Sequence, residues 1–501
     1  MKHKLFEVLI CLLLIATVVP VARGAVSWNE EQKLLPSDAS SNNAYGCSVS
    51  LSGDTALIGA YGDDSFKGSA LVFTRTGTTW IQQGKLLASD GRQGDQFGYS
   101  VCVDGDTALI GARGDDNNSG SVYVFIRNGT TWIQQAKLTV TSDGAANFGS
   151  SVSLEGNTAL ISASFDNKNH GSAYVFTRTG TTWTQEAKLL ASDGASMDFF
   201  GWSVSLSGDT ALVGAGYGAY VFTRTGTAWT QEAKLLASEI DGYSNLYVSL
   251  YDNIALIGTS EGVAYVLTRT GTTWTLQQQL LASDSASRFG CSVSLSGGTA
   301  LIGALAANGN EGSSGASYVF IRSGVTWAQQ AKLVASDGAA GDYFGASVSL
   351  DRNTALIGAS FWLKANTSAY VFTKSGEDTP PVAGFTWTPA APAINQTITF
   401  NASTSYDSDG FITLYDWDWN ADGTYEDSYA IPTVTHSWIQ AGIYPVTVRV
   451  TDDGGVSNTK TLPIPISSED DDADNNGTPG FQAILFIAAV CVALLLLRKK
   501  K

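Results

Sequence analysis

The fold is decided by four consecutive segments, which read Phe97-Gly-Tyr-Ser-Val-Cys-Val103, Gly105-Asp-Thr-Ala-Leu-Ile-Gly-Ala112, Ser121-Val-Tyr-Val-Phe-Ile-Arg127 and Trp132-Ile-Gln-Gln-Ala-Lys-Leu138. Each segment is short and rich in β-branched or aromatic residues, as is typical of a β-strand. The run Ala-Leu-Ile-Gly-Ala is continuously apolar, which suits a strand buried on both faces. Gly-Asp-Thr and Asn/Thr-Gly-Thr-Thr between segments are hairpin-turn sequences. The unit therefore predicts four antiparallel strands.

This unit recurs along residues 28–376, and two markers count it independently. The first is Gly-x-Ser-Val, with a degenerate copy, Asn245-Leu-Tyr-Val248, in fifth place; its other copies begin at Gly46, Gly98, Gly149, Gly201, Gly290 and Gly345. The second is a Trp…Lys-Leu strand beginning at Trp28, Trp80, Trp132, Trp183, Trp229, Trp274 and Trp327. In the sixth of these strands Gln279 replaces the lysine. Both markers give seven units, and repeated four-stranded sheets predict a seven-bladed β-propeller.

The two markers are out of phase, which predicts how the ring closes. The chain begins with a Trp strand that lacks its three partners, and the last unit stops at Lys374 without a Trp strand. We therefore expect Trp28–Leu35 to complete the seventh blade. Closure would leave no open sheet edge. The alternative, an open solenoid, would leave half a unit unpaired at each end.

Strand direction sorts the loops between two faces of the ring. One face carries the turns from first to second and from third to fourth strands, bordered by Arg75, Arg127 and their equivalents. The other carries the loops from second to third strands and the connections between blades. It is acidic, and it is interrupted by short loops in blades four and five. We predict ligand binding there, by Asp63, Asp64, Asp115 and Asp116, which offer acceptors and negative potential to a cationic or polyhydroxylated ligand. Solvation of an extracellular surface is the alternative reading of these acids.

Residues 28–376 resemble the FG-GAP repeats of integrin α-chain propellers and their prokaryotic relatives, through Phe-Gly-x-Ser-Val, Ala-Leu-Ile-Gly-Ala and Ala-Tyr-Val-Phe. The resemblance implies a propeller used for adhesion or ligand display. Integrin repeats carry a calcium loop between their first two strands, where this chain has only Ser52-Gly-Asp-Thr55. A two-residue turn cannot supply the six or more oxygens that Ca²⁺ needs. We therefore expect no calcium site in the blades.

A second domain is expected over 377–468. Its motifs Asp407-Ser-Asp-Gly410, Tyr415-Asp-Trp-Asp418, His436-Ser-Trp438 and Gly442-Ile-Tyr-Pro-Val446 resemble a PKD domain, which implies an immunoglobulin-like sandwich used as a spacer or interaction module. Strands are expected at Thr397–Phe400, Thr413–Trp419, Thr433–Trp438 and Gly442–Thr451. The aromatic residues Trp387, Trp417, Trp438 and Tyr444 are interpreted as core rather than as sugar-stacking platforms.

The sandwich contains the one candidate metal site in the sequence. Asp418, Asn420, Asp422 and Glu426 place oxygen ligands at alternating positions around Gly423, as a Ca²⁺ loop does. The twelfth position, where an EF-hand has glutamate, is Tyr429. A hairpin turn rich in Asp and Gly remains the alternative.

The two ends of the chain indicate export and anchoring. Residues 1–24 have the charged start and apolar centre of a signal peptide. An acidic linker, 469–480, precedes a 481–497 segment that is long enough to span a bilayer, and the basic tail 498–501 marks its cytoplasmic side. Thr478-Pro-Gly-Phe481 is similar to the sorting signals of archaeal surface proteins, which implies cleavage and lipid linkage. Sequons occur at Asn117, Asn128, Asn366, Asn395, Asn401 and Asn476.

Composition argues against several classes of function. A formal net charge of −17 should repel nucleic acid. The three histidines, His3, His170 and His436, suggest neither a zinc site nor a Ser-His-Asp set. We therefore predict a non-enzymatic binding, adhesion or scaffold protein, anchored in the membrane, whose partner is an extracellular protein or polysaccharide. The alternative is an extracellular carbohydrate-active enzyme with a catalytic propeller and a PKD accessory module.

Overall fold

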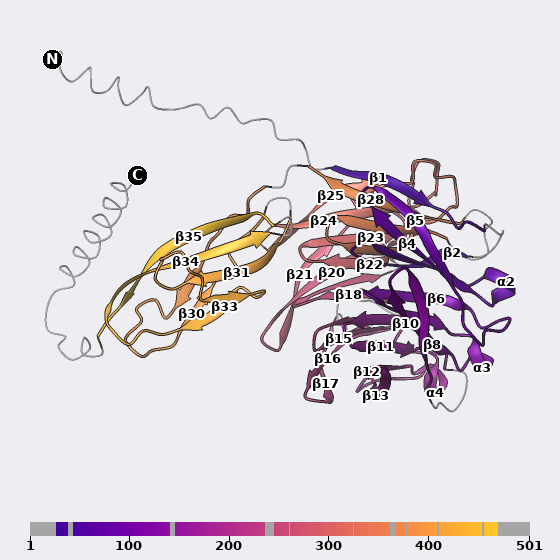
Figure 1. Ribbon diagram of the computed structural model, residues 1–501, viewed down its shortest axis with the longest axis horizontal. Coiled ribbons are helices and arrows are strands. Elements are labelled where there is room, and N and C mark those ends of the chain that lie inside the picture. The colour runs from indigo at the N-terminus through magenta and orange to yellow at the C-terminus, as the bar shows by residue number, and fades with distance from the viewer. Residues whose placement is uncertain are drawn as a thin grey trace, which may run out of the picture. The chain divides into compact units, whose positions relative to one another are not determined.

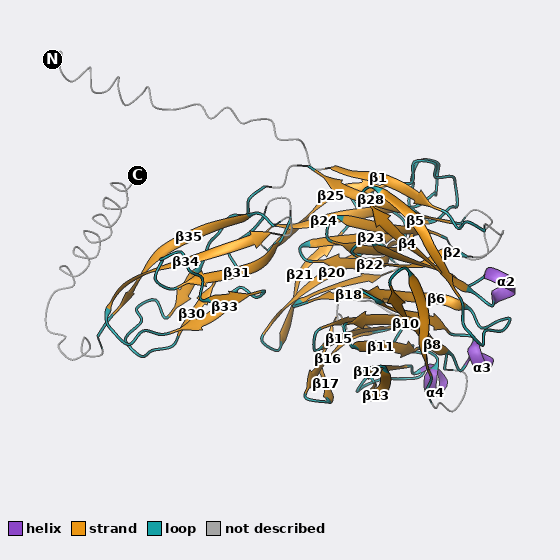
Figure 2. Cartoon of the chain, viewed as in Figure 1, coloured by secondary structure: helices purple, strands orange, loops and turns teal. Residues whose placement is uncertain are grey.

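The computed structural model describes residues 27–38, 44–140, 146–235, 245–259, 261–323, 325–360, 367–376, 379–407, 410–452 and 455–468. Strands dominate this part of the chain (Figure 2). The chain divides into two compact units, a propeller and a sandwich, which we describe separately. The expected signal peptide, acidic linker, anchor and basic tail lie outside the described residues. Within the ranges given, no helix has the length and apolarity needed to cross a membrane.

Seven four-stranded antiparallel sheets form the propeller (Figure 1). Blade 1 is β2 (Tyr45–Ser52), β3 (Thr55–Ala60), β4 (Ser69–Thr76) and β5 (Thr79–Leu86). Blade 2 is β6 (Phe97–Asp104), β7 (Thr107–Ala112), β8 (Ser121–Asn128) and β9 (Thr131–Leu138). Blade 3 is β10 (Phe148–Glu155), β11 (Thr158–Ala163), β12 (Ser172–Thr179) and β13 (Thr182–Leu189). Blade 4 is β14 (Ser203–Ser207), β15 (Thr210–Ala215), β16 (Gly218–Thr225) and β17 (Ala228–Leu235).

The remaining blades follow the same order. Blade 5 is β18 (Leu246–Tyr251), β19 (Ile254–Thr259), β20 (Ala264–Thr270) and β21 (Thr273–Leu280). Blade 6 is β22 (Phe289–Ser296), β23 (Thr299–Ala304), β24 (Ala316–Ser323) and β25 (Thr326–Leu333). Blade 7 is β26 (Phe344–Asp351), β27 (Thr354–Ala359), β28 (Ser368–Ser375) and, from the start of the chain, β1 (Ser27–Leu34).

The predicted closure of the ring is confirmed. β1 pairs antiparallel with β28, with Trp28 opposite Lys374 and Leu34 opposite Ala369. Both Trp28 and Leu34 are buried. The innermost strands contact one another in ring order, β2, β6, β10, β14, β18, β22 and β26, and β26 contacts β2 again. The open-solenoid alternative is therefore wrong.

The repeat glycine is required because neighbouring blades meet through their backbones. Gly98 has φ = +87°, and a Cβ there would lie 2.1 Å from the Ser69 carbonyl oxygen of the preceding blade. A Cβ on Gly59 would in turn lie 2.1 Å from the Gly98 carbonyl oxygen. The ladder between β6 and β7 is interrupted at this glycine by a bulge between Phe97 and Ser100. Such a bulge changes the direction of the side chain inside it, which here is that of Tyr99.

Serine side chains of the repeat form hydrogen bonds with backbone groups at the inner edge of the sheets. An innermost strand has a row of backbone N–H groups without a partner in its own sheet. The Val101 and Val103 N–H groups donate to the Ser48 and Ser50 hydroxyls of the preceding blade, at 3.0 and 2.9 Å. The Leu51 N–H donates to the Ser349 hydroxyl at 3.0 Å, between blade 1 and blade 7, where the ring closes. Serine hydroxyls accept in this way at six of the seven junctions between blades. At the junction of blades 2 and 3, the Ser100 hydroxyl instead donates to the Gly149 carbonyl at 2.7 Å.

The second unit is a sandwich of a three-stranded and a four-stranded sheet. The first has the order β29 (Thr386–Thr388), β30 (Ile398–Asn401) and β33 (Thr433–His436); the second has the order β32 (Asp427–Tyr429), β31 (Ile412–Asp418), β34 (Gly442–Asp452) and β35 (Ser457–Ile466). All four expected strands are present, although β33 ends two residues early. Trp417 and Trp438 are buried, as expected of core residues, whereas Trp387 and Tyr444 are partly exposed.

Candidate functional site

The loops from second to third strands and the connections between blades share one side of the ring, as predicted; we call it the loop face. The N–H groups of Gly94 and Gln96, in the connection after blade 1, both donate to the Phe66 carbonyl, at 3.2 and 2.8 Å. Three short turns lie one after another on this face (Figure 1): α2 (Asp63–Phe66), α3 (Asp115–Asn118) and α4 (Asp166–Asn169). Each contains successive residues in the left-handed region.

Two of the four predicted ligand-binding acids lie inside these turns rather than on the surface. Asp115 is 4% exposed and accepts from the Lys137 ammonium at 2.6 Å and from the Ser121 hydroxyl at 2.6 Å. The Lys137 ammonium also contacts Asp90, in the connection before blade 2, at 2.7 Å. Asp63 is likewise buried and pairs with Lys85 at 2.8 Å.

In two of the blades the ion pair lowers the pKa of the buried carboxylate. Burial by itself raises the pKa of Asp63, but the hydrogen bond and charge of Lys85 outweigh it, so the net pKa lies below the ordinary value. Asp166 in blade 3 has the same arrangement with Lys188, at 2.8 Å, and a pKa shifted in the same direction. Sequence reasoning did not select Asp166, although it stands at the same place before a Gly-Ser pair. The three buried acids thus tie the loop to the outermost strand.

The other two predicted acids are oriented differently. Asp64 and Asp116 are exposed and adopt left-handed conformations, with φ = 46° and 48°. The structure therefore separates the predicted set of four into two solvent-facing and two ion-paired acids. Ligand binding by Asp64 and Asp116 stays a prediction.

The opposite side of the ring, the turn face, uses its arginines in a repeated contact. Arg127 donates to Asp106 at 2.6 Å and to Thr55 of the preceding blade at 3.0 Å, and its guanidinium lies 5.6 Å from the Trp132 ring centroid. The contacts to a threonine of the preceding blade and to a tryptophan ring recur at Arg75, Arg178, Arg224 and Arg269. The acceptor in the turn is Asp54, Asn157 and Asp209 for the first three of these arginines. This basic border therefore holds neighbouring blades together.

The residue after the repeat glycine is a feature that sequence reasoning missed. Tyr99, in blade 2, lies under the Arg113 guanidinium, 3.6 Å from the ring centroid, and 5.4 Å from the Tyr61 ring. Arg113 is held in place by donating to Gln96 at 2.8 Å. A cation is therefore already seated on the face of this tyrosine.

A second aromatic pair comes from blades 4 and 5. Trp202 follows Gly201, and Tyr247 stands near the start of β18. Both side chains are partly exposed, and burial raises the pKa of Tyr247.

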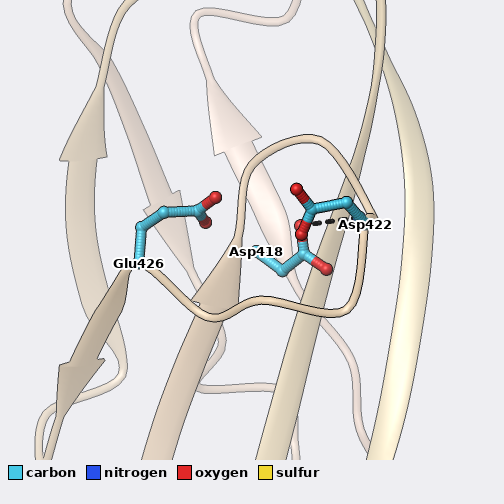
Figure 3. A group of neighbouring side chains, drawn as sticks. All are labelled: Asp418, Asp422 and Glu426. Carbon is cyan, nitrogen blue, oxygen red and sulfur yellow. Dashed lines mark hydrogen bonds between the residues drawn. The ribbon is translucent and has the colours of Figure 1, made fainter.

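The predicted calcium ligands converge in the sandwich. Ligand oxygens of Asp418, Asp422 and Glu426 lie within 4.8 Å of one another, and Figure 3 shows them around the loop that follows β31. Asp418 is 2% exposed and accepts from the Gly423 N–H at 2.8 Å. Hydrogen bonds from the Thr424 backbone and hydroxyl lower the pKa of Asp422. The loop is thus folded around the Asp418 carboxylate, which accepts from its backbone N–H groups.

This set of side chains fits Ca²⁺. Three carboxylates can supply three to six oxygens, and the remaining positions can be filled by water and backbone carbonyls. A carboxylate oxygen that accepts one N–H still has a lone pair for a cation. The Asn420 side-chain oxygen accepts from the Asp422 N–H at 2.8 Å and, with two lone pairs, also keeps one for a cation. The Asp- and Gly-rich turn of the alternative reading is also present, so both interpretations remain compatible with this geometry.

Four of the six asparagines in predicted glycosylation sequons lie in the part of the chain that the structure describes. Asn117, Asn128 and Asn395 are exposed and Asn401 is partly exposed, whereas Asn366 and Asn476 lie outside the described residues.

The three described cysteines are free. Burial raises the pKa of Cys47 to about 12 and the pKa values of Cys102 and Cys291 to about 11, which disfavours their thiolate forms.

Comparison with known proteins gives two families and several solved structures. The PKD domain family matches residues 378–466. A structure described as carbohydrate-binding modules from the β-sandwich superfamily is 38% identical over 19% of this chain and 36% of that chain, with a TM-score of 0.18; the match thus spans about a third of the other chain. The PKD1 domain of Vibrio anguillarum Epp is 27% identical over 18% of this chain and 99% of that one, with a TM-score of 0.16. Saccharomyces cerevisiae Sqt1 is 12% identical over 87% and 100%, with a TM-score of 0.41.

The propeller itself is matched by repeats of one family. FG-GAP repeats match residues 28–73, 80–125, 132–176, 183–228, 274–320 and 327–372. The segment left between the fourth and fifth matches contains the degenerate marker Asn245-Leu-Tyr-Val248. These six segments make up more than half of the 501 residues. The chain therefore belongs to the FG-GAP repeat family.

Proposed function

We propose that this chain is an exported, non-catalytic binding protein of the cell surface, and that its propeller presents the binding site on the loop face. The observation that supports this most is the contrast between a rigid ring and unequal loops. The backbone contacts and serine hydrogen bonds described above fix the blades. The loops differ, because residues 61–68 of blade 1 correspond to only 216–217 in blade 4. Variable loops on a rigid scaffold are where ligands usually bind.

The ion pairs support binding over catalysis. A glycoside-cleaving enzyme needs two carboxylates at a set separation, one of them able to hold or release a proton near neutral pH. Asp63 and Asp166 instead have pKa values held low by lysines, and their oxygens are engaged. Acids in this state reinforce loops and are poor proton donors at pH 7. The enzymatic alternative would need carboxylates elsewhere on the chain.

The signal-like start, the sequons and the anchor-like end support a place at the cell surface. Their sequence features are the basis of this part of the proposal, since residues 1–24 and 469–501 lie outside the described ranges. The partner is an extracellular protein or polysaccharide.

The full chain, purified in detergent, should be applied to an array of extracellular polysaccharides and proteins while the release of reducing sugar ends is followed. We expect retention on particular spots without product release. Product release from a retained polysaccharide would favour the carbohydrate-active alternative, and uniform failure of retention would contradict the binding proposal.

A further inference from the structure

The loop of blade 3 on the loop face, residues 164–171, carries an aromatic ring that its counterparts lack. Phe165 directly precedes α4, whereas Gly62 and Gly114 precede α2 and α3. The Phe165 ring is partly exposed and packs edge to face on the Phe199 ring, with the two centroids 5.2 Å apart. Phe199 belongs to the connection between blades 3 and 4. The ring pair therefore joins these two segments by an apolar contact that a glycine cannot make.

Met197, in the same connection, adopts a backbone conformation that favours glycine. Its φ is +75°, and the residue is 55% exposed. Its place is taken by Gly94 (φ = +93°) before blade 2 and by Gly341 (φ = +80°) before blade 7. Each of the three precedes an aspartate that accepts from the backbone N–H three residues earlier in the chain. An exposed methionine in the left-handed region adds strain without filling the core, and such strain is characteristic of binding sites.

Hydrogen bonds between the two segments keep these side chains on one part of the loop face. The Asn169 side-chain amide donates to the Met197 thioether at 3.4 Å, and the Phe199 N–H donates to the Asn169 carbonyl at 3.0 Å. Phe165 is held there by its ring contact with Phe199. We call Phe165, Met197 and Phe199 the apolar patch.

The short loop of blade 4 leaves the surface beside the apolar patch low. Only residues 216–217 separate β15 from β16. The Gly216 N–H donates to the Asp198 carbonyl at 2.7 Å, so this loop lies against the connection that carries Met197. Tyr217, the other residue of the loop, is 47% exposed. A partner can therefore reach the apolar patch from the side of blade 4.

The turn beside the apolar patch has lost the exposed acid of the other turns. Asn167 and Lys168 of α4 occupy the places of Asp64 and Ser65 in α2. Lys168 is exposed, and its carbonyl accepts from the Ser196 hydroxyl at 3.1 Å. This hydrogen bond places Lys168 next to the connection, one residue away from Met197 along the chain.

The local charge favours an acidic group on the partner. Asp166 and Asp193, in the same two segments, pair with Lys188 and Lys234 at 2.8 and 2.7 Å, while Lys168 faces solvent. The formal net charge of −17 repels an acidic partner at long range. Charges on a protein surface are, however, largely screened beyond about 8 Å at physiological ionic strength. At contact, Lys168 therefore decides the sign of the charge that is attracted.

The side chains of the apolar patch fit an apolar group better than a sugar. Phenylalanine and methionine side chains have no N–H or O–H to donate, so a saccharide buried on them would leave hydroxyls without partners. An apolar side chain is buried there without that cost. Methionine is also flexible and polarisable, and it adapts to apolar partners of different shapes.

We propose that the apolar patch is a docking site for a segment of another extracellular protein, in which a large apolar side chain stands beside Asp or Glu. The apolar side chain packs on Phe165, Met197 and Phe199, and the carboxylate pairs with Lys168. This inference rests on the proposed binding function and specifies its site and its partner. Neither the acidic turns nor the sandwich is needed for it.

The repeat itself supplies matched variants. Each introduces the residue that another blade has at the same place: Met197→Gly after Gly94, Phe199→Gln after Gln96 and Lys168→Ser after Ser65. All three should therefore fold. Met197→Gly should melt within about 2 °C of the unmodified chain, because the relief of strain offsets the flexibility of glycine. Ile133→Ser, which removes a 54% exposed side chain from β9, is the control.

Binding should be measured with the full chain in detergent and three pools of immobilised synthetic peptides. The first pool has Leu, Ile or Phe beside Asp or Glu, the second has Lys in place of the acids, and the third has Ser in place of the apolar residues. We expect the first pool to retain the chain best. Affinity for its best peptide should be at least about ten-fold lower in Met197→Gly and in Phe199→Gln, about three-fold lower in Lys168→Ser, and unchanged in Ile133→Ser.

Oxidation gives a second readout at the apolar patch. The sequence has two methionines, Met1 and Met197, so an oxygen atom gained in a proteolytic fragment that contains residue 197 reports on this site alone. Dilute hydrogen peroxide should convert the exposed Met197 to its sulfoxide in the free chain. The bound peptide should slow this conversion.

The outcomes separate this inference from the proposed function. The docking site is overturned if no pool retains the unmodified chain, if the third pool retains it as well as the first, or if the folded Met197→Gly and Phe199→Gln variants bind as tightly as the unmodified chain. The assignment of a protein partner is also overturned if the array retains the chain on polysaccharides alone. In each of these cases the general binding function stands, because its failure requires that the array of polysaccharides and proteins retains nothing.

Discussion

Replacing the lysine at one position of the repeat, in two different blades, tests how the loop face is held together. Lys137 and Lys234 occupy the same place in blades 2 and 4, and each ammonium lies over a tyrosine ring, at 5.2 and 5.1 Å. Lys137 pairs with the buried Asp115 and with Asp90, whereas the carboxylate that Lys234 pairs with is Asp193, which is 51% exposed. Gln279 already occupies this place in blade 5, so glutamine is sterically accepted.

The expected loss in free energy of unfolding depends on how deeply the partner carboxylate of each lysine is buried. Lys234→Gln removes a surface ion pair and should cost at most about 1 kcal/mol. Lys137→Gln leaves the Asp115 carboxylate buried without its cation, which costs about 3–5 kcal/mol in buried pairs. Because the Lys137 side chain is 24% exposed and water can replace part of it, we expect the lower end, about 3 kcal/mol. At roughly 2 °C per kcal/mol in a chain of this size, Lys137→Gln should melt about 4 °C below Lys234→Gln.

Differential scanning calorimetry of the two variants measures this difference, and Asp115→Asn provides the internal control. Combined with Lys137→Gln, it removes the unpaired charge and should recover part of the lost stability. Equal melting temperatures for the two lysine variants, or a double variant less stable than Lys137→Gln alone, would refute the assignment of Asp115 as a buried, ion-paired loop anchor.

Three further predictions concern closure, calcium and acid. Deleting 25–37 removes β1 and exposes the edge of β28, so aggregation or proteolysis should increase; unchanged melting and solubility would contradict the role of this strand in closure. We expect Ca²⁺ to act on the sandwich, if anywhere, and not on the blades, so Asp418→Asn should abolish any calorimetric heat of Ca²⁺ binding, and a stoichiometric Ca²⁺ site in residues 25–376 would contradict this prediction. The lowered pKa values of Asp63, Asp166, Asp193 and Asp337 stabilise the propeller above the unfolded pKa of about 3.9, and this stability should be lost as pH falls through the lower folded values. Circular dichroism during acid titration would count against this account if unfolding were complete above pH 5.

The blade count and the closure could be predicted because their signals are local and repeated. Each unit carries its own turns and apolar runs, and the phase difference between Trp28 and the marker at Gly46 shows which strand lacks a partner. β29, β32 and the terminal β35 were missed. β35 contains two prolines, Pro463 and Pro465, which weaken a strand signal, and it pairs as an edge strand where proline is tolerated.

Which of the loop acids are buried and ion-paired could not be predicted, because their burial depends on residues that other strands place around them. Asp115 looks like a solvated loop acid until Lys137 of β9 and Asp90 of the preceding connection are placed around it. The contact of the Arg113 guanidinium with the Tyr99 ring could not be predicted for the same reason. The signal that could have found this position is the variable residue after the repeat glycine, since the large rings of Tyr99 and Trp202 depart from the small residues of other blades.

The central claim is that the loop face of the propeller binds the ligand. Hydrogen exchange of the full chain, measured with and without a polysaccharide or protein that the array retains, tests this most directly. We predict protection in one or more segments of the loop face, such as residues 61–68, 113–120 or 164–171, with no change in the turns around Asp54 and Asp106. Protection confined to the turn face, or to residues 382–467, would contradict the account.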